Sequence, residues 1–327
     1  NPSPFGRGVG SEVRRIHDYL HTNAMIKLFY KFLTLFTRVF GTWFFKVFSR
    51  FVSAGYFLLF PSRVAIGVRF YRALFPERGR AYCLWLTWRQ FHGFTDVFLD
   101  RFLLQTSGDI SYTSEGWDIL QKAADDKTGG VIVMSHMGNW DVAAHLLRKR
   151  GLRLLLFMGM REKEQLEKMQ KESLAESGMT VIAVDREGGS PFDILEGPRF
   201  IREGGLISLT GDRLWTRDQR AVPVQFLGHR VLLPDAPHRI ALISGAPLYV
   251  FFAFRTGDKK YHFSISGPIR VAASTRAGRD SAVQESAQQY ADILAEKARQ
   301  YPVQWYHFEE FIGRDSNAMP GPGTHKS

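Results

Sequence analysis

The feature that most constrains the fold is an alternation of short apolar runs with helical ones in the second half of the chain. We interpret the apolar runs as strands, at residues 130–135, 153–158, 180–185, 206–211, 223–227, 247–255 and 260–267. Helices are predicted between them, at 140–150, 161–177, 191–204, 235–244 and 279–300. Strands that are apolar almost throughout are typical of sheets buried on both faces. The sequence therefore predicts an α/β fold with a mostly parallel central sheet covered by helices.

The chain before this alternation is predicted to be helical. Residues 13–105 read as helices with breaks near Pro61 and at 76–79, and residues 112–126 as a capped amphipathic helix starting at Thr113 or Ser114. We expect a helical, membrane-associating region at 13–105 and an α/β domain at 106–313. A leader at 1–12 and a tail at 314–327 are expected to be disordered.

The helical region has a distinctive charge pattern. The chain has a net charge of +11, and residues 19–76 contain no Asp or Glu but eight Lys and Arg among many aromatic residues. Basic charge among apolar and aromatic side chains suits the surface of an anionic bilayer. We therefore expect anionic membrane lipids to be partners of this region.

The mode of membrane attachment is less constrained. The longest uncharged stretch of the acid-free region, 51–62, is shorter than the roughly 20 apolar residues of a spanning helix, so we favour a helix lying in the interface. Residues 41–61 could still span with Lys46 and Arg50 reaching the headgroups. A basic core helix is the alternative. Nucleic acid binding is not expected, because the aromatic residues are not set between polar residues as stacking platforms.

The cysteine content excludes some kinds of site. Cys83 is the single cysteine, so neither a disulfide within the chain nor a cysteine-based zinc site can form, and a reducing compartment is favoured. The histidine spacing gives no plausible metal set. We expect no metal and no bound cofactor.

A histidine stands where one predicted strand ends. The stretch "VIVMSHMGNWD" begins at Val131 and reaches His136 after the apolar run. Loops at the carboxyl ends of strands carry the chemistry of open α/β sheets. A turn through Gly138 and a helix capped by Asn139 would put Asp141 in the first helical turn, within reach of the imidazole. His136 would then be a general base and Asp141 its orienter; the alternative is that both residues are structural.

No nucleophile accompanies this pair. Ser135 precedes the histidine, but no G-x-S-x-G elbow surrounds it. A His–Asp pair without a covalent partner suits direct transfer, in which an acceptor hydroxyl or amine loses a proton to the base and attacks an activated acyl group.

The pattern H-x-x-x-x-D after an apolar strand resembles the lysophospholipid acyltransferase superfamily. Ordered blocks over residues 80–312 are most similar to the late acyltransferases of lipid A biosynthesis and the related phosphatidylinositol mannoside acyltransferases. These blocks are "FMGMREKEQLEK" (157–168), "EGGLISLTGDRLWTRDQ" (203–219), "VPVQFLG" (222–228), "HRIALISGAPLYVFFAFR" (238–255) and "YPVQWYHFEEF" (301–311). The lipid A members usually have Glu at the Asp141 position, and the N-terminal region here is more basic than a plain membrane anchor.

The resemblance implies that 106–313 is an acyltransferase domain. Such an enzyme moves a fatty acyl chain from an acyl carrier protein or coenzyme A thioester, as co-substrate, to a hydroxyl of a glycolipid or lipid A-type acceptor. The expected location is the cytoplasmic face of the bacterial inner membrane, attached peripherally or by a single anchor. The resemblance assigns a substrate role to Arg161, with a surface ion pair as the alternative. Asp212, which follows another strand, would orient Arg161 or bind the acceptor, and Arg213 beside it would bind substrate.

Other functions remain open on the sequence alone. The acceptor could be a mannolipid, an ornithine lipid or another lipid. The chain could be an esterase or thioesterase that passes the acyl group to water, or a non-catalytic basic module that binds membranes or RNA. The remaining polar and aromatic residues are predicted to be structural or to form a basic rim that attracts phosphorylated lipid or carrier protein. The structural set is His145, Trp305 and Tyr306, and the rim is Arg217, Arg220 and Arg230.

Overall fold

The structure is a computed structural model that describes residues 43–107, 110–159, 180–184, 191–214 and 219–313. It divides into two units, residues 1–56 and 57–327. The described part of the first unit, residues 43–56, is helical. The predicted leader, tail and 161–177 helix, together with Arg161, lie outside the described residues. The second unit contains the central sheet.

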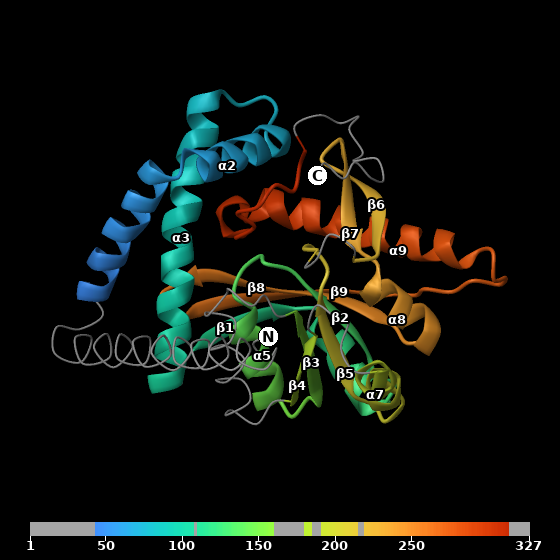
Figure 1. Ribbon diagram of the computed structural model, residues 1–327. Coiled ribbons are helices and arrows are strands. Elements are labelled where there is room, and N and C mark those ends of the chain that lie inside the picture. Colours follow the sequence, from blue (N-terminus) through green and yellow to red (C-terminus); the bar gives the residue numbers. More distant parts are fainter. Residues whose placement is uncertain (1–42, 108–109, 160–179, 185–190, 215–218, 314–327) are drawn as a thin grey trace, which may run out of the picture. The chain divides into compact units, whose positions relative to one another are not determined.

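Seven strands form the central sheet in the order β1-β9-β8-β2-β5-β3-β4 (Figure 1). Five neighbouring strands, β8, β2, β5, β3 and β4, run parallel, whereas β9 is antiparallel to β8 and parallel to β1. The predicted α/β fold with a mostly parallel sheet is therefore confirmed. The strands are β1 (Ser111–Glu115), β2 (Gly130–Met134), β3 (Leu154–Gly159), β4 (Thr180–Val184), β5 (Leu206–Thr210), β8 (Leu248–Gly257) and β9 (Lys260–Ile269).

The helices follow the predicted alternation closely. Breaks in the helical region fall near Pro61 and at 76–79 as predicted, and four of the predicted helices in the α/β part are found within two residues of their expected ends. The helices are α2 (Pro61–Leu74), α3 (Arg80–Ser107), α4 (Trp117–Asp125), α5 (Trp140–Lys149), α7 (Pro191–Arg202), α8 (Ala236–Ser244) and α9 (Arg279–Gln300), followed by the 3-10 turn η2 (Pro302–Gln304).

Helices cover both faces of the sheet, and strand β2 shows why. Because successive side chains of a strand point to opposite faces, Val131 and Val133 belong to one apolar core while Ile132 and Met134 belong to another. The first core includes residues of α7, α8 and α9, and the second includes residues of α4 and α5. Figure 1 shows α9 and α5 on opposite sides of the sheet. The all-apolar strand thus lies in the middle of three layers.

Two elements differ from the sequence prediction. The predicted helix 112–126 was wrong over its first turn: Ser111–Glu115 is strand β1, and α4 begins only after Gly116, whose φ of +71° breaks the helix. The ring of Tyr112 stacks on Phe263 of β9 at 5.1 Å, so tertiary pairing outweighs the local capping signal. The structure also adds β7 (His229–Pro234), which pairs with β6 (Ala221–Phe226) in a separate hairpin beside α9.

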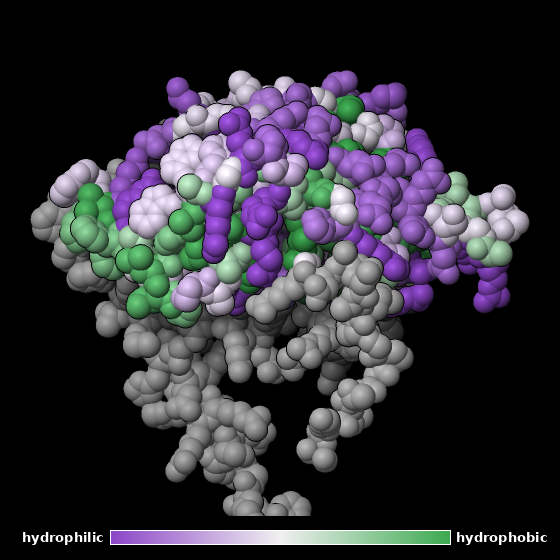
Figure 2. Space-filling model, turned by 90° about the horizontal axis from the view of Figure 1, so that it is seen from above, coloured by the Kyte–Doolittle hydropathy of each residue, from purple (hydrophilic) through white to green (hydrophobic). Residues whose placement is uncertain are grey.

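An apolar and aromatic surface lies on α3 and just before α2. Its most exposed members are Leu58, Leu59, Phe60, Leu84, Trp85 and Trp88, which we call the α2–α3 surface. Figure 2 shows hydrophobic residues gathered at the left of the face that is seen from above. Among the described residues no single helix is long and apolar enough to cross a membrane; Trp43–Leu59 and Pro61–Leu74 meet that test only as a bent pair, by length and composition.

Candidate active site

Two polar side chains meet just beyond the carboxyl ends of β2 and β5. These strands are parallel neighbours in which Met134 pairs with Thr210, so His136 and Asp212 each lie two residues past a paired position. The Nδ1 atom of His136 is 2.9 Å from Oδ1 of Asp212, and the His136 backbone N–H donates to Oδ2 at 2.8 Å. Asp212 is 1% exposed, whereas the His136 side chain is 19% exposed. Strand register therefore brings a buried carboxylate to a partly accessible imidazole.

The electrostatics of the pair fix where its proton sits. Burial raises the pKa of Asp212, but attraction to His136 and hydrogen bonds from His136 and Trp305 outweigh it, and the pKa falls to about 2. Asp212 is therefore ionised at neutral pH and can only accept hydrogen bonds. The neutral imidazole must then carry its hydrogen on Nδ1, which places the basic lone pair on Nε2.

The turn that carries His136 is held by the C-terminal segment. The Tyr306 N–H donates to the His136 carbonyl at 2.8 Å, and the Gly138 N–H donates to the Gln304 carbonyl at 2.8 Å. The Gln304 side chain in turn accepts from the backbone N–H of Arg255 at 2.8 Å and donates to its carbonyl at 2.9 Å. Segments far apart in the sequence thus fix the backbone on both sides of the imidazole.

The path into α5 depends on glycine and asparagine. Gly138 has φ +77°, and a Cβ there would lie 2.1 Å from the Ala253 carbonyl oxygen, so only glycine fits. The Asn139 N–H donates to that same carbonyl at 2.8 Å, and its Oδ1 accepts from the Val142 N–H at 3.5 Å, the position of a helix N-cap. Asp141 follows in the first turn of α5 and is 7% exposed. The predicted turn, cap and helix start are confirmed.

The predicted site residues are only partly brought together. The carboxylate bonded to Nδ1 of His136 is that of Asp212, which sequence reasoning assigned to the acceptor side; the role of Asp141 as orienter stays a prediction. Arg213 donates to Oε1 of Glu309 at 2.9 Å, so its charge is paired with the C-terminal segment. The substrate roles proposed for Arg161 and Arg213 stay predictions as well.

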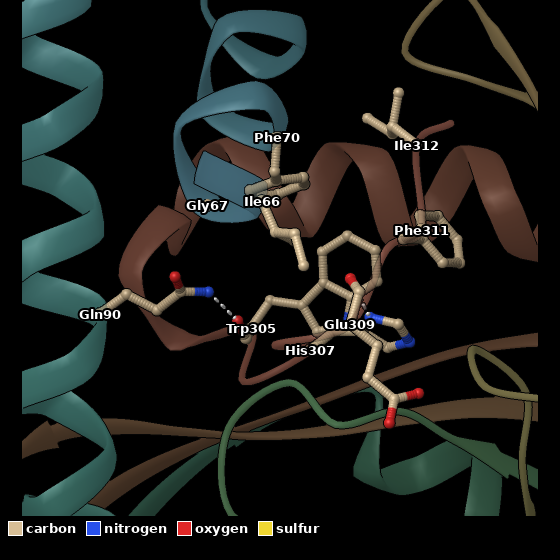
Figure 3. Close-up of a pocket in the computed structure, with 9 residues that line it drawn as sticks. All are labelled: Ile66, Gly67, Phe70, Gln90, Trp305, His307, Glu309, Phe311 and Ile312. Carbon is tan, nitrogen blue, oxygen red and sulfur yellow. Dashed lines mark hydrogen bonds between the residues drawn. The ribbon is translucent and has the colours of Figure 1, made fainter. Parts of the chain in front are cut away.

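A small pocket lies beside this centre (Figure 3). Its walls are mostly apolar and come from α2, the C-terminal segment and Gln90 of α3; they include Ile66, Phe70, Trp305, His307, Phe311 and Ile312. The rings of His307 and His136 are 6.1 Å apart, so the pocket wall reaches the His–Asp pair. Burial lowers the pKa of His307 to about 4 despite the nearby Asp212 carboxylate, so this imidazole is neutral at neutral pH. Sequence reasoning missed His307, whose one signal is its place directly after the "QWY" run.

Within the part of the chain that the structure describes, no group of three or more His, Cys, Asp and Glu side chains is arranged to hold a metal ion. The expectation that the chain needs no metal or cofactor stays a prediction.

Comparison with known proteins gives one family and a set of relatives. The profile of a family described as bacterial lipid A biosynthesis acyltransferase matches residues 101–310. A phosphatidylinositol mannoside acyltransferase of Mycolicibacterium smegmatis is 26% identical over 191 residues, which are 58% of this chain and 58% of that protein. One from Mycobacterium tuberculosis strain H37Rv is 25% identical over 191 residues, 58% of this chain and 57% of that protein. The chain thus matches less than two thirds of the length of these curated relatives.

Proposed function

Because the chain belongs to the bacterial lipid A biosynthesis acyltransferase family, we propose that it transfers a fatty acyl chain from a thioester to a hydroxyl group of a lipid acceptor. The observation that carries this proposal is the contact of His136 with a buried, ionised Asp212 at the carboxyl edge of the sheet. This contact orients the imidazole with Nε2 as the basic atom.

The reaction follows from that orientation. Nε2 of His136 removes the proton of the acceptor hydroxyl while its oxygen attacks the thioester carbonyl. The new C–O bond forms, the C–S bond breaks, and the departing sulfur takes the proton back from the imidazolium. Asp212 stabilises the imidazolium between these steps, as a buried carboxylate does in hydrolytic triads.

The acceptor is a glycolipid hydroxyl under this proposal. The family profile is named for lipid A, whereas both relatives described above are named as phosphatidylinositol mannoside acyltransferases. The named relatives favour a mannosylated lipid over lipid A. The acyl donor is the thioester of acyl carrier protein or coenzyme A, taken up as a co-substrate.

Membrane attachment is part of the same proposal, because both the acceptor and the acyl chain are lipids. Residues 24–72 and the α2–α3 surface would dock the chain on an anionic bilayer at the cytoplasmic face of the inner membrane. The guanidinium of Arg89 lies 5.1 Å from the Trp85 ring centroid, and that of Arg78 lies 5.2 Å from Tyr82. Trp85 is exposed and Tyr82 is half-buried. Arginine next to such aromatic rings suits the headgroup layer, where both charged and amphipathic groups are stabilised.

An assay with a radiolabelled acyl thioester tests this function. Purified wild-type protein should form labelled lipid only when a glycolipid acceptor is present, with lipid A precursors and mannosylated lipids supplied in parallel. His136→Ala should lower this rate by about 10²–10⁴, the usual worth of a general base. His229→Ala, a partly exposed histidine of the β6–β7 hairpin, serves as the matched control.

Two results would contradict the proposal. Release of free fatty acid at the same rate with and without acceptor would identify an esterase or thioesterase. An unchanged transfer rate in folded His136→Ala protein would make the histidine structural and remove the mechanism.

A further inference from the structure

Trp305 contacts the His–Asp pair directly, although its sequence context indicates a core residue. Its indole Nε1–H donates to Oδ2 of Asp212 at 2.7 Å. The same oxygen accepts the His136 backbone N–H, while Oδ1 faces Nδ1 of the ring. We propose that Trp305 is a positioning residue for acyl transfer, which holds the Asp212 carboxylate in the orientation that presents it to His136. This inference rests on the proposed function.

The geometry explains why a donor is needed at this place. A buried carboxylate is stable as an anion only when its oxygens accept hydrogen bonds. The other two contacts both come from His136, one from its ring and one from its backbone N–H. The indole N–H is a donor only and belongs to a different segment, so it fixes the carboxylate independently of the imidazole. Loss of that donor leaves Asp212 able to rotate away from Nδ1.

The surroundings hold the indole ring rigidly. Trp305 is 2% exposed, and its ring packs against Phe70 at 5.0 Å, Phe226 at 5.5 Å and Phe311 at 4.9 Å between centroids. Its backbone forms a bridge with Met137, next to the histidine. One residue therefore connects the turn that carries the imidazole with the carboxylate that orients it, and its indole is also a wall of the neighbouring pocket (Figure 3).

A purely structural role makes a different prediction. If Trp305 only fills the core, any ring of similar volume should preserve activity once stability is matched. If it positions Asp212, the N–H itself matters. Two replacements separate these cases: Trp305→Phe removes the donor and part of the volume, and β-(3-benzothienyl)alanine at this position keeps the indole shape with sulfur in place of N–H.

Kinetics and pH dependence provide the first readout. Both variants should lower kcat by about 10- to 100-fold, the usual worth of a hydrogen bond to a charged group, with the acceptor KM within about twofold. The titratable groups that act on Asp212 are His136, His307 and Tyr290. Without the indole donor, the carboxylate no longer stays against Nδ1 and stabilises the imidazolium less. The acid limb of the pH–rate profile should therefore move to lower pH.

A second readout does not depend on activity. In protein with ¹⁵N-labelled histidine, the Nδ1–H proton of His136 should give a distinct signal in the wild type and exchange faster with water in both variants. This signal distinguishes the role of Trp305 from the proposed function. Absence of transferase activity in the wild type would contradict the function, whereas an Nδ1–H signal that is unchanged in the two Trp305 variants would contradict the role of Trp305.

Leu294→Ala is the matched control, because Leu294 is a fully buried core residue of α9. It should lower the melting temperature without moving the acid limb or the Nδ1–H signal. Unchanged kcat and acid limb in the folded variants would overturn the inference. So would failure of the benzothienyl variant to fold, because the N–H would then serve the fold.

Discussion

His136 and Asp212 are 76 positions apart in the sequence, yet each follows its strand at the same distance. His136 lies two residues after Met134 of β2, and Asp212 lies two residues after Thr210 of β5, which pairs with Met134. The contact between them is therefore specified by the register of β2 against β5. Because side chains alternate between the faces of a strand, a slip of one residue would turn one partner away from the other. The site depends on sheet pairing rather than on a local motif.

The first prediction compares the two carboxylates. Asp212→Asn should lower transfer by about 10²–10⁴, because an amide at Nδ1 no longer favours the correct tautomer or the charged imidazolium. Asp141→Asn should cost less than His136→Ala, and Asp141→Glu should keep appreciable activity, since it retains a carboxylate in the first turn of α5. Steady-state rates of purified variants with matched circular dichroism spectra give the order. A larger loss in Asp141→Asn than in Asp212→Asn would make Asp141 the main orienter.

The second prediction concerns the turn after β2. Gly138 and Gly151 have nearly the same φ, +77° and +78°. A Cβ at Gly138 would lie 2.1 Å from the Ala253 carbonyl oxygen, whereas a Cβ at Gly151 would have no atom within 4 Å. Gly151→Ala should cost about 1–2 kcal/mol, the strain of a left-handed residue. Gly138→Ala should cost more and also abolish transfer, because the His136 turn must shift. Urea denaturation and the transfer assay measure both, and equal effects in the two variants would refute the steric argument.

The third prediction is a loss of stability in acid. His238 is fully buried with Nδ1 2.8 Å from Oγ of Ser286, and burial lowers its pKa from 6.5 to about 4. Below pH 6.5 His238 binds a proton in the unfolded chain but stays neutral in the folded chain. The free energy of unfolding therefore falls as the pH drops from 6.5 to 4. The single histidine accounts for about 3 kcal/mol of this loss.

The variant His238→Gln cannot gain this proton. Its free energy of unfolding should therefore change less between pH 7 and pH 4.5 than that of the wild type, as measured by urea titration. His229→Gln is the control and should follow the wild type. Identical pH dependence in wild type and His238→Gln would show that His238 is accessible to protons in the folded state.

The fourth prediction concerns the membrane. Leu59 before α2 and Ile243 of α8 are equally exposed, at 77% each. Leu59→Ser, especially combined with Trp85→Ser, should reduce co-sedimentation with anionic vesicles, whereas Ile243→Ser should not. Wild-type binding should weaken as salt rises, because each basic residue near the surface contributes about 1 kcal/mol. Binding that survives both high salt and carbonate washing would instead indicate a spanning anchor.

The strands and helices could largely be predicted from the sequence because their patterns are local. Val131–Met134 is apolar on both faces, and this alone indicates a strand in the middle of three layers. Strand β1 was missed for the opposite reason. Ser111–Glu115 lies at the sheet edge, mostly exposed, and becomes a strand through its partner β9 rather than through its own composition.

The same limit applies to the site. His136 was recognisable because it directly follows a strand, and its turn could be derived from Gly138 and Asn139. Its bond to Asp212 could not be derived, because the sequence does not reveal that β2 and β5 are neighbours. The contributions of Trp305 and His307 were hidden for the same reason, since both reach the imidazole from a segment near residue 305.

The backbone hydrogen bonds of Gln304 and Tyr306 to the His136 turn have a consequence for protein synthesis. The ribosome produces His136 and Asp212 long before these two residues, whereas a domain generally folds as a unit. Until the last segment has been synthesised, the turn lacks its hydrogen bonds from Tyr306 and to Gln304. We therefore expect a chain truncated before residue 304 to lack the backbone hydrogen bonds that hold the imidazole in place.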